Sequence, residues 1–237
     1  IDHIISFGNA ESVGAGVQAL AEKVKLHPSC SCVSATILAD KVTYKVGMSG
    51  AHHVQNSLAV LAAVSLAGAD LALGALSLAD HDGLVGRGER HYLHAEGGQY
   101  ILVDESYNAN PTSMAAALTT LGLATREGRG RRIAVLGDMA ELGAQAIDLH
   151  IQLADTIAET EIDEVLTHGP LSHHLHQNLP ATCSAYHATS LADLTDYLLR
   201  DVRAGDVVMV KGSNASGMGA VVDALVQADE SAVAQSV

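Results

Sequence analysis

The sequence predicts an α/β protein of two domains, the second of them Rossmann-like, with a mostly parallel sheet plus a hairpin strand. From residue 133 onward, short runs that read as strands alternate with helical stretches, which implies a parallel sheet. A segment rich in glycine and charge, Gly83–Arg90, precedes this pattern. We place the domain boundary there, which gives domains 1–84 and 85–237.

In the first domain, three strands and two helices are expected. The strands are predicted at Ile1 to about Gly8, Ser31–Leu38 and Lys41–Val46, the last two around a turn at Ala39-Asp40. Residues 10–23 are expected to form a loop and helix or an irregular connection. Over His53–Ala67 the apolar residues keep helical spacing until Gly68, and Asp70–Ala79 predicts a second, shorter helix.

In the second domain, His91–Ala95 and Gln99–Val103 predict a hairpin around Glu96-Gly97-Gly98. The later strands are predicted at Ile133–Leu136, Glu164–Thr167, Ser184–His187 and Val207–Val210. The helices between and after them are predicted near Ala146–Ala158, near Leu171, at Leu191–Leu199 and at Gly219–Gln227. The tail from Asp229 is expected to be disordered.

Composition excludes several classes of function. A net charge of −14 argues against nucleic acid or an anionic membrane surface as a partner, because both require a basic face. No apolar run approaches the roughly 20 residues of a membrane span. The odd number of cysteines, Cys30, Cys32 and Cys183, forms no metal or redox pattern and suits a reducing cytoplasm.

Polar chemistry is concentrated in the stretch Tyr100–Leu118. Its opening apolar run indicates a buried strand, which ends in the adjacent carboxylates Asp104 and Glu105. Asn110 followed by Pro111 predicts a helix N-cap and first turn. The polar groups thus lie between a strand's carboxyl end and a helix's amino end, where open α/β sheets bind ligands. An ordinary capped polar loop would look the same.

The octapeptide Asp104–Pro111 resembles a signature of the Mur ligase family, and further matches follow in that family's order. These matches are Gly50–Asn56, Gly86–Gly88, Leu136–Gly143 and Lys211–Ser213. The resemblance implies the end of a central, ATP-binding Mur ligase domain followed by the C-terminal Mur ligase domain. It also implies a cytoplasmic, monomeric ligase of peptidoglycan-precursor synthesis.

The activity implied by the resemblance is ATP-dependent amide formation between UDP-N-acetylmuramoyl-tripeptide and D-alanyl-D-alanine. ATP would phosphorylate the tripeptide carboxylate, and the dipeptide's amino group would displace phosphate from the acyl phosphate. The ligands of the Mg²⁺ that accompanies ATP are expected mainly upstream of this chain, and no residue here is assigned to a metal.

For the nucleotide, the resemblance implies four residues, of which Asn56 is the expected adenine contact. Arg87, on a glycine-flanked hinge, would swing in to neutralise phosphoryl charge, although Arg90 is a rival. Glu105 matches a carboxylate that contacts the ribose, with Asp104 as the alternative. His52 matches the histidine that lies near the nucleotide in the family's version of Gly50–Asn56. A capped helix with surface histidines is the simpler interpretation of that segment.

For the dipeptide, Lys211 and Ser213 could hold the carboxylate, with Asn108 and Asn110 nearby. The segment from Lys211 to Gly219 is a glycine- and serine-rich strand–turn–helix, which offers free N–H groups to an anion. An exposed lysine in a tight turn is the alternative. Arg87 and Lys211 are the expected catalytic residues.

Two other segments have simpler explanations. Asp138, in Leu136–Gly143, suits a wall of the site, and helix capping explains it nearly as well. No carboxylate or cysteine lies at metal-ligand spacing from the histidines His173, His174 and His176. We therefore interpret them as a solvated helix face.

The sequence contains no G-x-x-x-x-G-K-[ST] phosphate loop. We therefore expect only the C-terminal part of such a ligase, inactive by itself. A non-catalytic nucleotide- or peptide-binding module is the main alternative. A Rossmann-type oxidoreductase is disfavoured, because no strand–turn–helix carries the G-x-G-x-x-G fingerprint.

Overall fold

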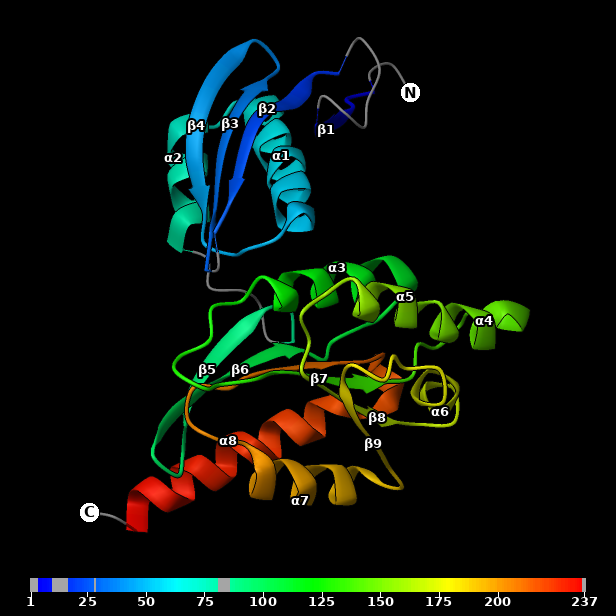
Figure 1. Ribbon diagram of the computed structural model, residues 1–237. Coiled ribbons are helices and arrows are strands. Elements are labelled where there is room, and N and C mark those ends of the chain that lie inside the picture. Colours follow the sequence, from blue (N-terminus) through cyan, green and yellow to red (C-terminus); the bar gives the residue numbers. More distant parts are fainter. Residues whose placement is uncertain (1–3, 10–16, 28, 81–85, 236–237) are drawn as a thin grey trace. The chain divides into compact units, whose positions relative to one another are not determined.

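A computed structural model of the chain describes residues 4–9, 17–27, 29–80 and 86–235 (Figure 1). The described residues form two compact units, one that ends at Asp80 and one that starts at Gly86. The predicted boundary after residue 84, and Gly83 with it, lies outside the described residues and stays a prediction.

The first unit has a four-stranded sheet in the order β1-β2-β3-β4, covered by helices α1 and α2. Its elements are β1 (Phe7–Asn9), β2 (Ala19–Leu26), β3 (Ser31–Ile37), β4 (Asp40–Val46), α1 (Ala51–Leu66), α2 (Leu71–Ser77) and the 3₁₀ turn η1 (Leu78–Asp80). The β3–β4 hairpin and both helices are confirmed. The prediction for residues 19–23 is wrong, because Ala19 and Ala21 alternate into the core as part of β2. Alanine has little strand propensity, so tertiary packing decides this segment.

The second unit has a six-stranded sheet in the order β5-β6-β10-β7-β8-β9, in which only β5 is antiparallel. Its strands are β5 (Glu89–Ala95), β6 (Gly98–Glu105), β7 (Arg132–Gly137), β8 (Glu164–His168), β9 (Ser184–Ala188) and β10 (Val207–Lys211). Its α-helices are α3 (Pro111–Gly122), α4 (Ala146–Ile151), α5 (Leu153–Ala158), α6 (Ser172–His176), α7 (Leu191–Asp201) and α8 (Met218–Gln235), with 3₁₀ turns η2 (Gly143–Gln145) and η3 (Asn214–Ser216). The predicted mostly parallel sheet with a hairpin strand is confirmed.

Helices cover both faces of this sheet (Figure 1). Strand residues alternate between the two cores: Val208 and Val210 face the core under α7 and α8, whereas Val207 and Met209 face the core under α3, α5 and α6. β10 is central and buried on both sides, so the loop that follows its carboxyl end starts from a rigid part of the sheet. Within the described residues, no helix is long and apolar enough to cross a membrane.

The C-terminal tail is not disordered as predicted, since α8 continues to Gln235. Asp229 on this helix accepts hydrogen bonds from the backbone N–H of His94 at 2.6 Å and from its ring Nδ1 at 3.1 Å. These contacts attach the second half of α8 to β5. The sequence pattern does not reveal such a pairing, because the partners are 135 residues apart.

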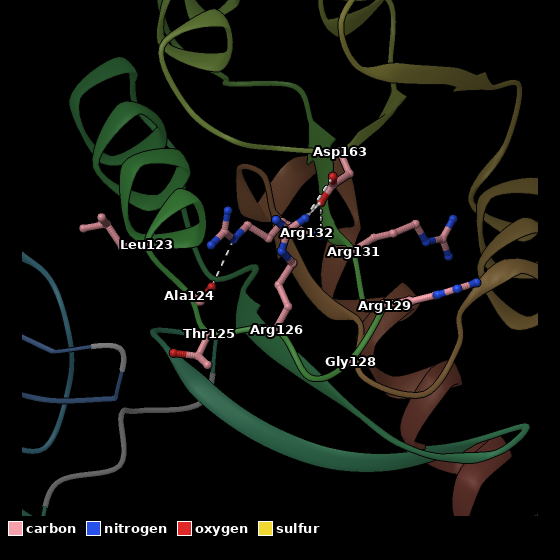
Figure 2. A pocket seen from close by; sticks show the side chains of 10 residues that line it. Leu123, Ala124, Thr125, Arg126, Gly128, Arg129, Arg131, Arg132 and Asp163 are labelled. Atoms are coloured by element: carbon pink, nitrogen blue, oxygen red, sulfur yellow. Dashed lines mark hydrogen bonds and ion pairs between the residues drawn. The ribbon is translucent and has the colours of Figure 1, made fainter.

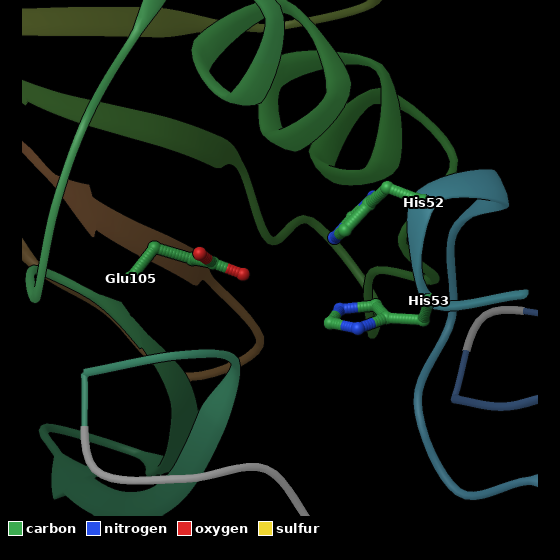
Figure 3. Close-up of side chains that lie close together, drawn as sticks. All are labelled: His52, His53 and Glu105. Atoms are coloured by element: carbon green, nitrogen blue, oxygen red, sulfur yellow. The ribbon is translucent and has the colours of Figure 1, made fainter. Parts of the chain in front are cut away.

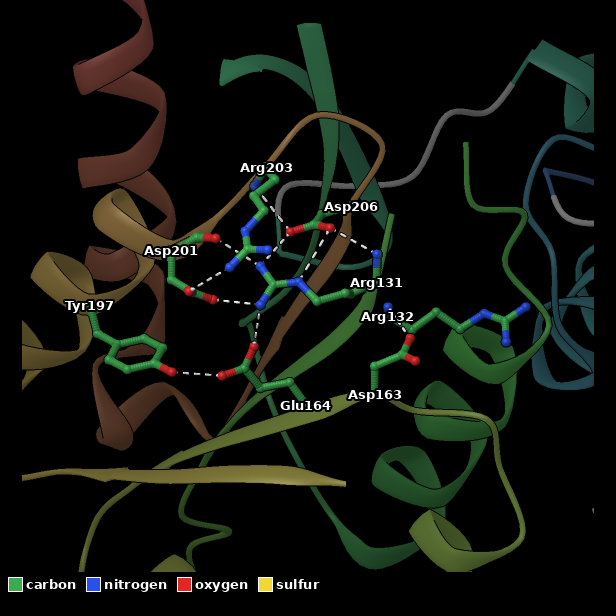
Figure 4. A network of polar contacts seen from close by, with 8 residues as sticks. All are labelled: Arg131, Arg132, Asp163, Glu164, Tyr197, Asp201, Arg203 and Asp206. Atoms are coloured by element: carbon green, nitrogen blue, oxygen red, sulfur yellow. Dashed lines mark hydrogen bonds and ion pairs between the residues drawn. The ribbon is translucent and has the colours of Figure 1, made fainter. Parts of the chain in front are cut away.

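Arg131 organises the amino edge of the same sheet (Figure 4). Its guanidinium donates to Glu164 at 2.9 Å, to Asp201 at 2.6 Å and to Asp206 at 2.7 Å. Burial works to lower the pKa of Arg131, but the hydrogen bonds to Asp206 and Asp201 outweigh it and raise the pKa. Because the side chains of Glu164 and Asp206 are only 4% and 1% exposed, they depend on this one cation.

We expect Arg131→Met to lower the free energy of unfolding by about 3–5 kcal/mol, because it leaves the buried carboxylates of Glu164 and Asp206 without their cation. Urea denaturation followed by circular dichroism measures the change. Arg129→Met is the matched control: Arg129 is exposed on the same loop, so its replacement should change stability by less than about 0.5 kcal/mol. Equal effects of the two substitutions would contradict this account.

The predicted solvated histidine face is wrong for His173 and His176, which are partly buried on α6 and pack against His187 of β9. The ring centroid of His187 lies 4.5 Å from that of His173 and 5.6 Å from that of His176. Burial and the neighbouring histidines lower the pKa of both His176 and His187. His168, which lowers the pKa of His187 further, and Asp138, which raises it, also face this cluster.

These shifts predict acid-sensitive folding. The unfolded chain takes up protons near the ordinary histidine value of 6.5, before the folded cluster does, so stability is lost as pH falls below that value. The melting temperature should fall less between pH 7.5 and 5.5 in His176→Gln/His187→Gln than in the wild type. His174→Gln, on the same helix, should behave like the wild type. An unchanged pH dependence in the double variant would exclude the cluster as the cause.

Candidate functional site

Three strands of the second unit end side by side at its carboxyl edge. In the parallel register of β10 with its neighbours, Lys211 lies opposite Glu105 at the end of β6 and opposite Leu136 near the end of β7. The loops that follow these strands carry most of the residues that the sequence implicates. This is the edge at which open α/β sheets bind ligands.

Lys211 is buried rather than exposed, so the alternative of a solvated turn lysine is wrong. It is 2% exposed, and its Nζ donates to the backbone oxygen of Asn108 at 2.9 Å and lies 3.4 Å from Oε2 of Glu105. Burial lowers the pKa of Lys211 and raises the pKa of Glu105, and the attraction between the two groups opposes both shifts. The ammonium therefore joins the end of β10 to the end of β6 and to the loop that follows it.

The loop after β6 presents two amides to solvent. Asn110 caps α3 as predicted: its Oδ1 accepts from the N–H of Ser113 at 2.8 Å, and the Ser113 side chain completes a capping box. Asn108 is exposed, and its Oδ1 accepts from the N–H of Ala109 at 2.8 Å. Both oxygens are thus used locally, whereas the Nδ2 groups make no hydrogen bond to any described residue.

Ser213, in the loop after β10, contacts the loop after β7 rather than Lys211. Its Oγ donates to the backbone oxygen of Asp138 at 2.7 Å. The Asp138 carboxylate in turn accepts from the N–H groups of Ser172 at 2.7 Å and Leu171 at 3.3 Å, at the start of α6. The capping interpretation of Asp138 is therefore correct, although the helix that it caps comes from another loop.

These contacts surround a cleft of about 330 Å³ between the loops that follow β7, β8 and β10. Ser213 and Asp138 line it, together with His168 at the end of β8 and residues 169–171 after it. The loop after β8 is absent from the predicted site. Its position after the carboxyl end of a parallel strand is the signal that would have indicated it.

Arg87 is exposed and lies on the second unit, with its guanidinium carbon 4.3 Å from the centroid of the Tyr107 ring. Hydrogen bonds fix the adjacent glycines: the N–H of Gly86 donates to the Asp104 carboxylate at 3.0 Å, and the N–H of Gly88 donates to the Asp104 backbone oxygen at 2.8 Å. Gly86 has φ of 71°, and a Cβ there would lie 2.8 Å from the backbone of Tyr107. These contacts attach Gly86 and Gly88 to the end of β6, and the hinge at Arg87 stays a prediction. Arg87 is close enough to lower the pKa of both Glu105 and Lys211.

His52 and Asn56 lie on α1 of the first unit. Asn56 is exposed on the face away from the buried Leu58 and Leu61, where its amide can meet a ligand. The rings of His52 and His53 are 3.9 Å apart between centroids and tilted by 43° (Figure 3). Within the first unit, Asn56 and His52 are therefore both on the first two turns of one helix.

A second hollow, of about 580 Å³, lies at the opposite, amino edge of the six-stranded sheet (Figure 2). Two of the arginines that line it have acidic partners: Arg126 donates to Asp163 at 2.9 Å and Arg132 to Glu161 at 2.9 Å. Because acidic partners hold Arg126 and Arg132, we attribute this hollow to the stability of the sheet. The candidate site is the carboxyl edge.

Comparison with known proteins identifies a matching family. The family model "Mur ligase, glutamate ligase domain" matches residues 86–214, which include every implicated residue of the second unit. UDP-N-acetylmuramoyl-tripeptide–D-alanyl-D-alanine ligase of Mycobacterium tuberculosis H37Rv is 32% identical over 78% of this chain and 40% of its own length. The Escherichia coli K12 protein of the same name is 35% identical over 75% of this chain and 38% of its own length.

Solved structures share the fold. That of the Acinetobacter baumannii UDP-N-acetylmuramoylalanyl-D-glutamyl-2,6-diaminopimelate–D-alanyl-D-alanyl ligase has a TM-score of 0.73 and 24% identity, over 90% of this chain and 45% of that one. MurF ligase from Thermotoga maritima in complex with ADP has a TM-score of 0.71 and 20% identity, over 92% and 48%. The chain thus spans about two fifths of the length of the curated relatives described above.

The geometry predicts strong coupling between Lys211 and Glu105. Lys211→Met should cost about 3–5 kcal/mol of stability, because it leaves a carboxylate that is only 16% exposed without its cation. Adding Glu105→Gln should restore part of the loss, with a coupling energy of about 0.5–3 kcal/mol in a double-mutant cycle by urea denaturation. Lys45→Met, at an exposed position of β4, is the control and should have little effect. Additive losses would show that the two groups do not interact.

Proposed function

Because this chain belongs to the Mur ligase family, we propose that it is the C-terminal part of a ligase that adds D-alanyl-D-alanine to UDP-N-acetylmuramoyl-tripeptide. The observation that carries this proposal is the identity of 32–35% to relatives that bear that activity in their names. The polar carboxyl edge, where Glu105, Asn108 and Lys211 meet, supports it. A reducing compartment such as the cytoplasm fits the three free cysteines.

The reaction proposed is amide formation at the expense of ATP, in which the tripeptide carboxylate becomes an acyl phosphate that the dipeptide's amine attacks. Phosphoryl charge develops in such a reaction, and Arg87 is an exposed guanidinium that can neutralise it. Asn56 offers an exposed amide for an adenine edge, and His52 lies on the same helix. We assign no described residue to the accompanying Mg²⁺.

Glu105 is suited to hold a ribose hydroxyl. Its Oε2 is paired with Lys211, and among the described residues its Oε1 has no hydrogen-bond partner. A partly buried carboxylate oxygen makes a stronger hydrogen bond than an exposed one, because less water competes for it. Asp104 is the weaker candidate, since both of its carboxylate oxygens already accept backbone N–H groups.

The carboxylate of the dipeptide fits the exposed amides of Asn108 and Asn110, whose Nδ2 groups can donate to it. Ser213 lines the neighbouring cleft, where its backbone and side chain are already bonded to Asp138. Lys211 acts from beneath, as a positioning residue: its ammonium holds the Asn108 carbonyl at 2.9 Å and attracts a negative charge above it.

Phosphate release by the full-length protein that contains this chain tests the proposal. With UDP-N-acetylmuramoyl-tripeptide and ATP present, release should require D-alanyl-D-alanine and should not occur with D-glutamate, L-alanine or D-alanine. Release with a single amino acid but not with the dipeptide would assign the chain to another member of the family. Ligand binding without any turnover would favour a non-catalytic binding module.

For the nucleotide contacts, we expect Asn56→Ala and Glu105→Gln to raise the KM for ATP. The loss of a hydrogen bond to a ligand costs about 0.5–3 kcal/mol, so the increase should be several-fold to roughly a hundred-fold. The KM for the dipeptide should stay within about two-fold, and steady-state kinetics with each substrate varied in turn separates the two constants.

The controls for these variants are Asn178→Ala and Glu127→Gln, both at exposed positions of the second unit away from the carboxyl edge. Asn108→Ala should have the opposite effect: it should raise the KM for the dipeptide and leave the KM for ATP unchanged. If only the KM for the dipeptide rises in Asn56→Ala and Glu105→Gln, the nucleotide and dipeptide contacts are assigned the wrong way round.

A further inference from the structure

Glu89, His91 and Asp104 gather on one face of the β5–β6 hairpin. Glu89 pairs directly with Asp104 in the antiparallel register, and His91 lies two residues further along β5. Side chains two apart on a strand share a face, and directly opposed residues of a pair also share it. One ring nitrogen of His91 and one carboxylate oxygen from each acid all lie within 4.8 Å of one another.

The Asp104 carboxylate is held in a fixed orientation. It is 4% exposed, and its two oxygens accept from the N–H of Gly86 at 3.0 Å and the N–H of Ser106 at 2.9 Å. Each carboxylate oxygen has two acceptor sites, so one on each oxygen remains for another partner. Hydrogen bonds of this kind orient the ligands of protein metal sites and tune their basicity.

One ring nitrogen of His91 lacks a hydrogen-bond partner among the described residues. Its Nε2 is buried and has no hydrogen-bond partner, although a buried polar nitrogen without a partner is unfavourable. The carboxylates beside it accept hydrogen bonds or bind cations. An imidazole nitrogen together with two carboxylates is a ligand set that binds divalent transition metals, whereas Mg²⁺ and Ca²⁺ prefer oxygen alone.

We propose that Glu89, His91 and Asp104 form a binding site for a divalent transition-metal ion, for which Zn²⁺ is the best match. Water completes the coordination, because Glu89 and His91 are only partly buried. The ion braces β5 against the end of β6. This site goes beyond the proposed ligase function and is separate from its nucleotide contact, since Asp104 and the adjacent Glu105 point to opposite faces of the sheet.

Isothermal titration of the metal-free protein with ZnCl₂ tests the site, in a buffer that does not chelate zinc. The wild type should bind one ion at this site, and both His91→Gln and Glu89→Gln should weaken that binding at least about 100-fold. Loss of an outer-shell partner alone costs 10–100-fold, so loss of a ligand should cost at least as much. Asp104 is left unchanged, because its carboxylate also holds two backbone N–H groups.

Two controls separate this site from other histidines. His94→Gln removes an exposed imidazole from the opposite face of the same strand and should bind like the wild type. His173→Gln/His176→Gln/His187→Gln removes the histidine cluster on α6 and β9 and should keep the site. If zinc binding survives in His91→Gln, or is lost only in the cluster variant, the assignment is overturned.

Thermal unfolding provides an independent readout. Zinc should raise the melting temperature of the wild type, because it binds the folded state, and should not raise that of His91→Gln. Without metal, His91→Gln should melt no lower than the wild type, since it removes a buried nitrogen that has no partner. Absence of saturable zinc binding to the wild type would also overturn the proposal.

Discussion

The buried ammonium of Lys211 is the constraint on which the carboxyl edge of the second unit depends. Removing a lysine from water costs several kcal/mol, so the group needs partners, and it has them in Asn108 and Glu105. These contacts connect the central strand to its neighbour and to the loop that follows. The Asn108 and Asn110 amides are therefore presented to solvent from a loop held at both ends, by the ammonium and by the cap of α3.

The two edges of this sheet use charge in opposite ways. At the amino edge, Arg131 is surrounded by three carboxylates and serves stability (Figure 4). At the carboxyl edge, polar groups outnumber their internal partners: the Nδ2 groups of Asn108 and Asn110 and Oε1 of Glu105 have none among the described residues. The loops that follow parallel strands all lie at the carboxyl edge of the sheet. Residues far apart in sequence, such as Asp138 and Ser213, therefore meet there.

The sequence predicts the alternating strands and helices and the Asn110 cap because these depend on local spacing and local hydrogen bonds. Features that depend on tertiary contacts escape it: β2, whose alanines are buried by packing; α8, which is held by Asp229 against β5; and the histidine cluster. For the site, a motif identifies Lys211 and Glu105 but not that the lysine is buried beneath its loop. Burial of a long charged side chain depends on partners more than 100 residues away.

We propose that ligands bind at the carboxyl edge of the six-stranded sheet. Titration of the ¹⁵N-labelled 24.5 kDa chain with D-alanyl-D-alanine, followed by amide chemical shifts, tests this proposal. We expect saturable shifts around Asn108, Asn110 and Ser213, and none around residues 126–132 at the amino edge. Shifts at the amino edge, or an unperturbed carboxyl edge at millimolar dipeptide, would contradict it.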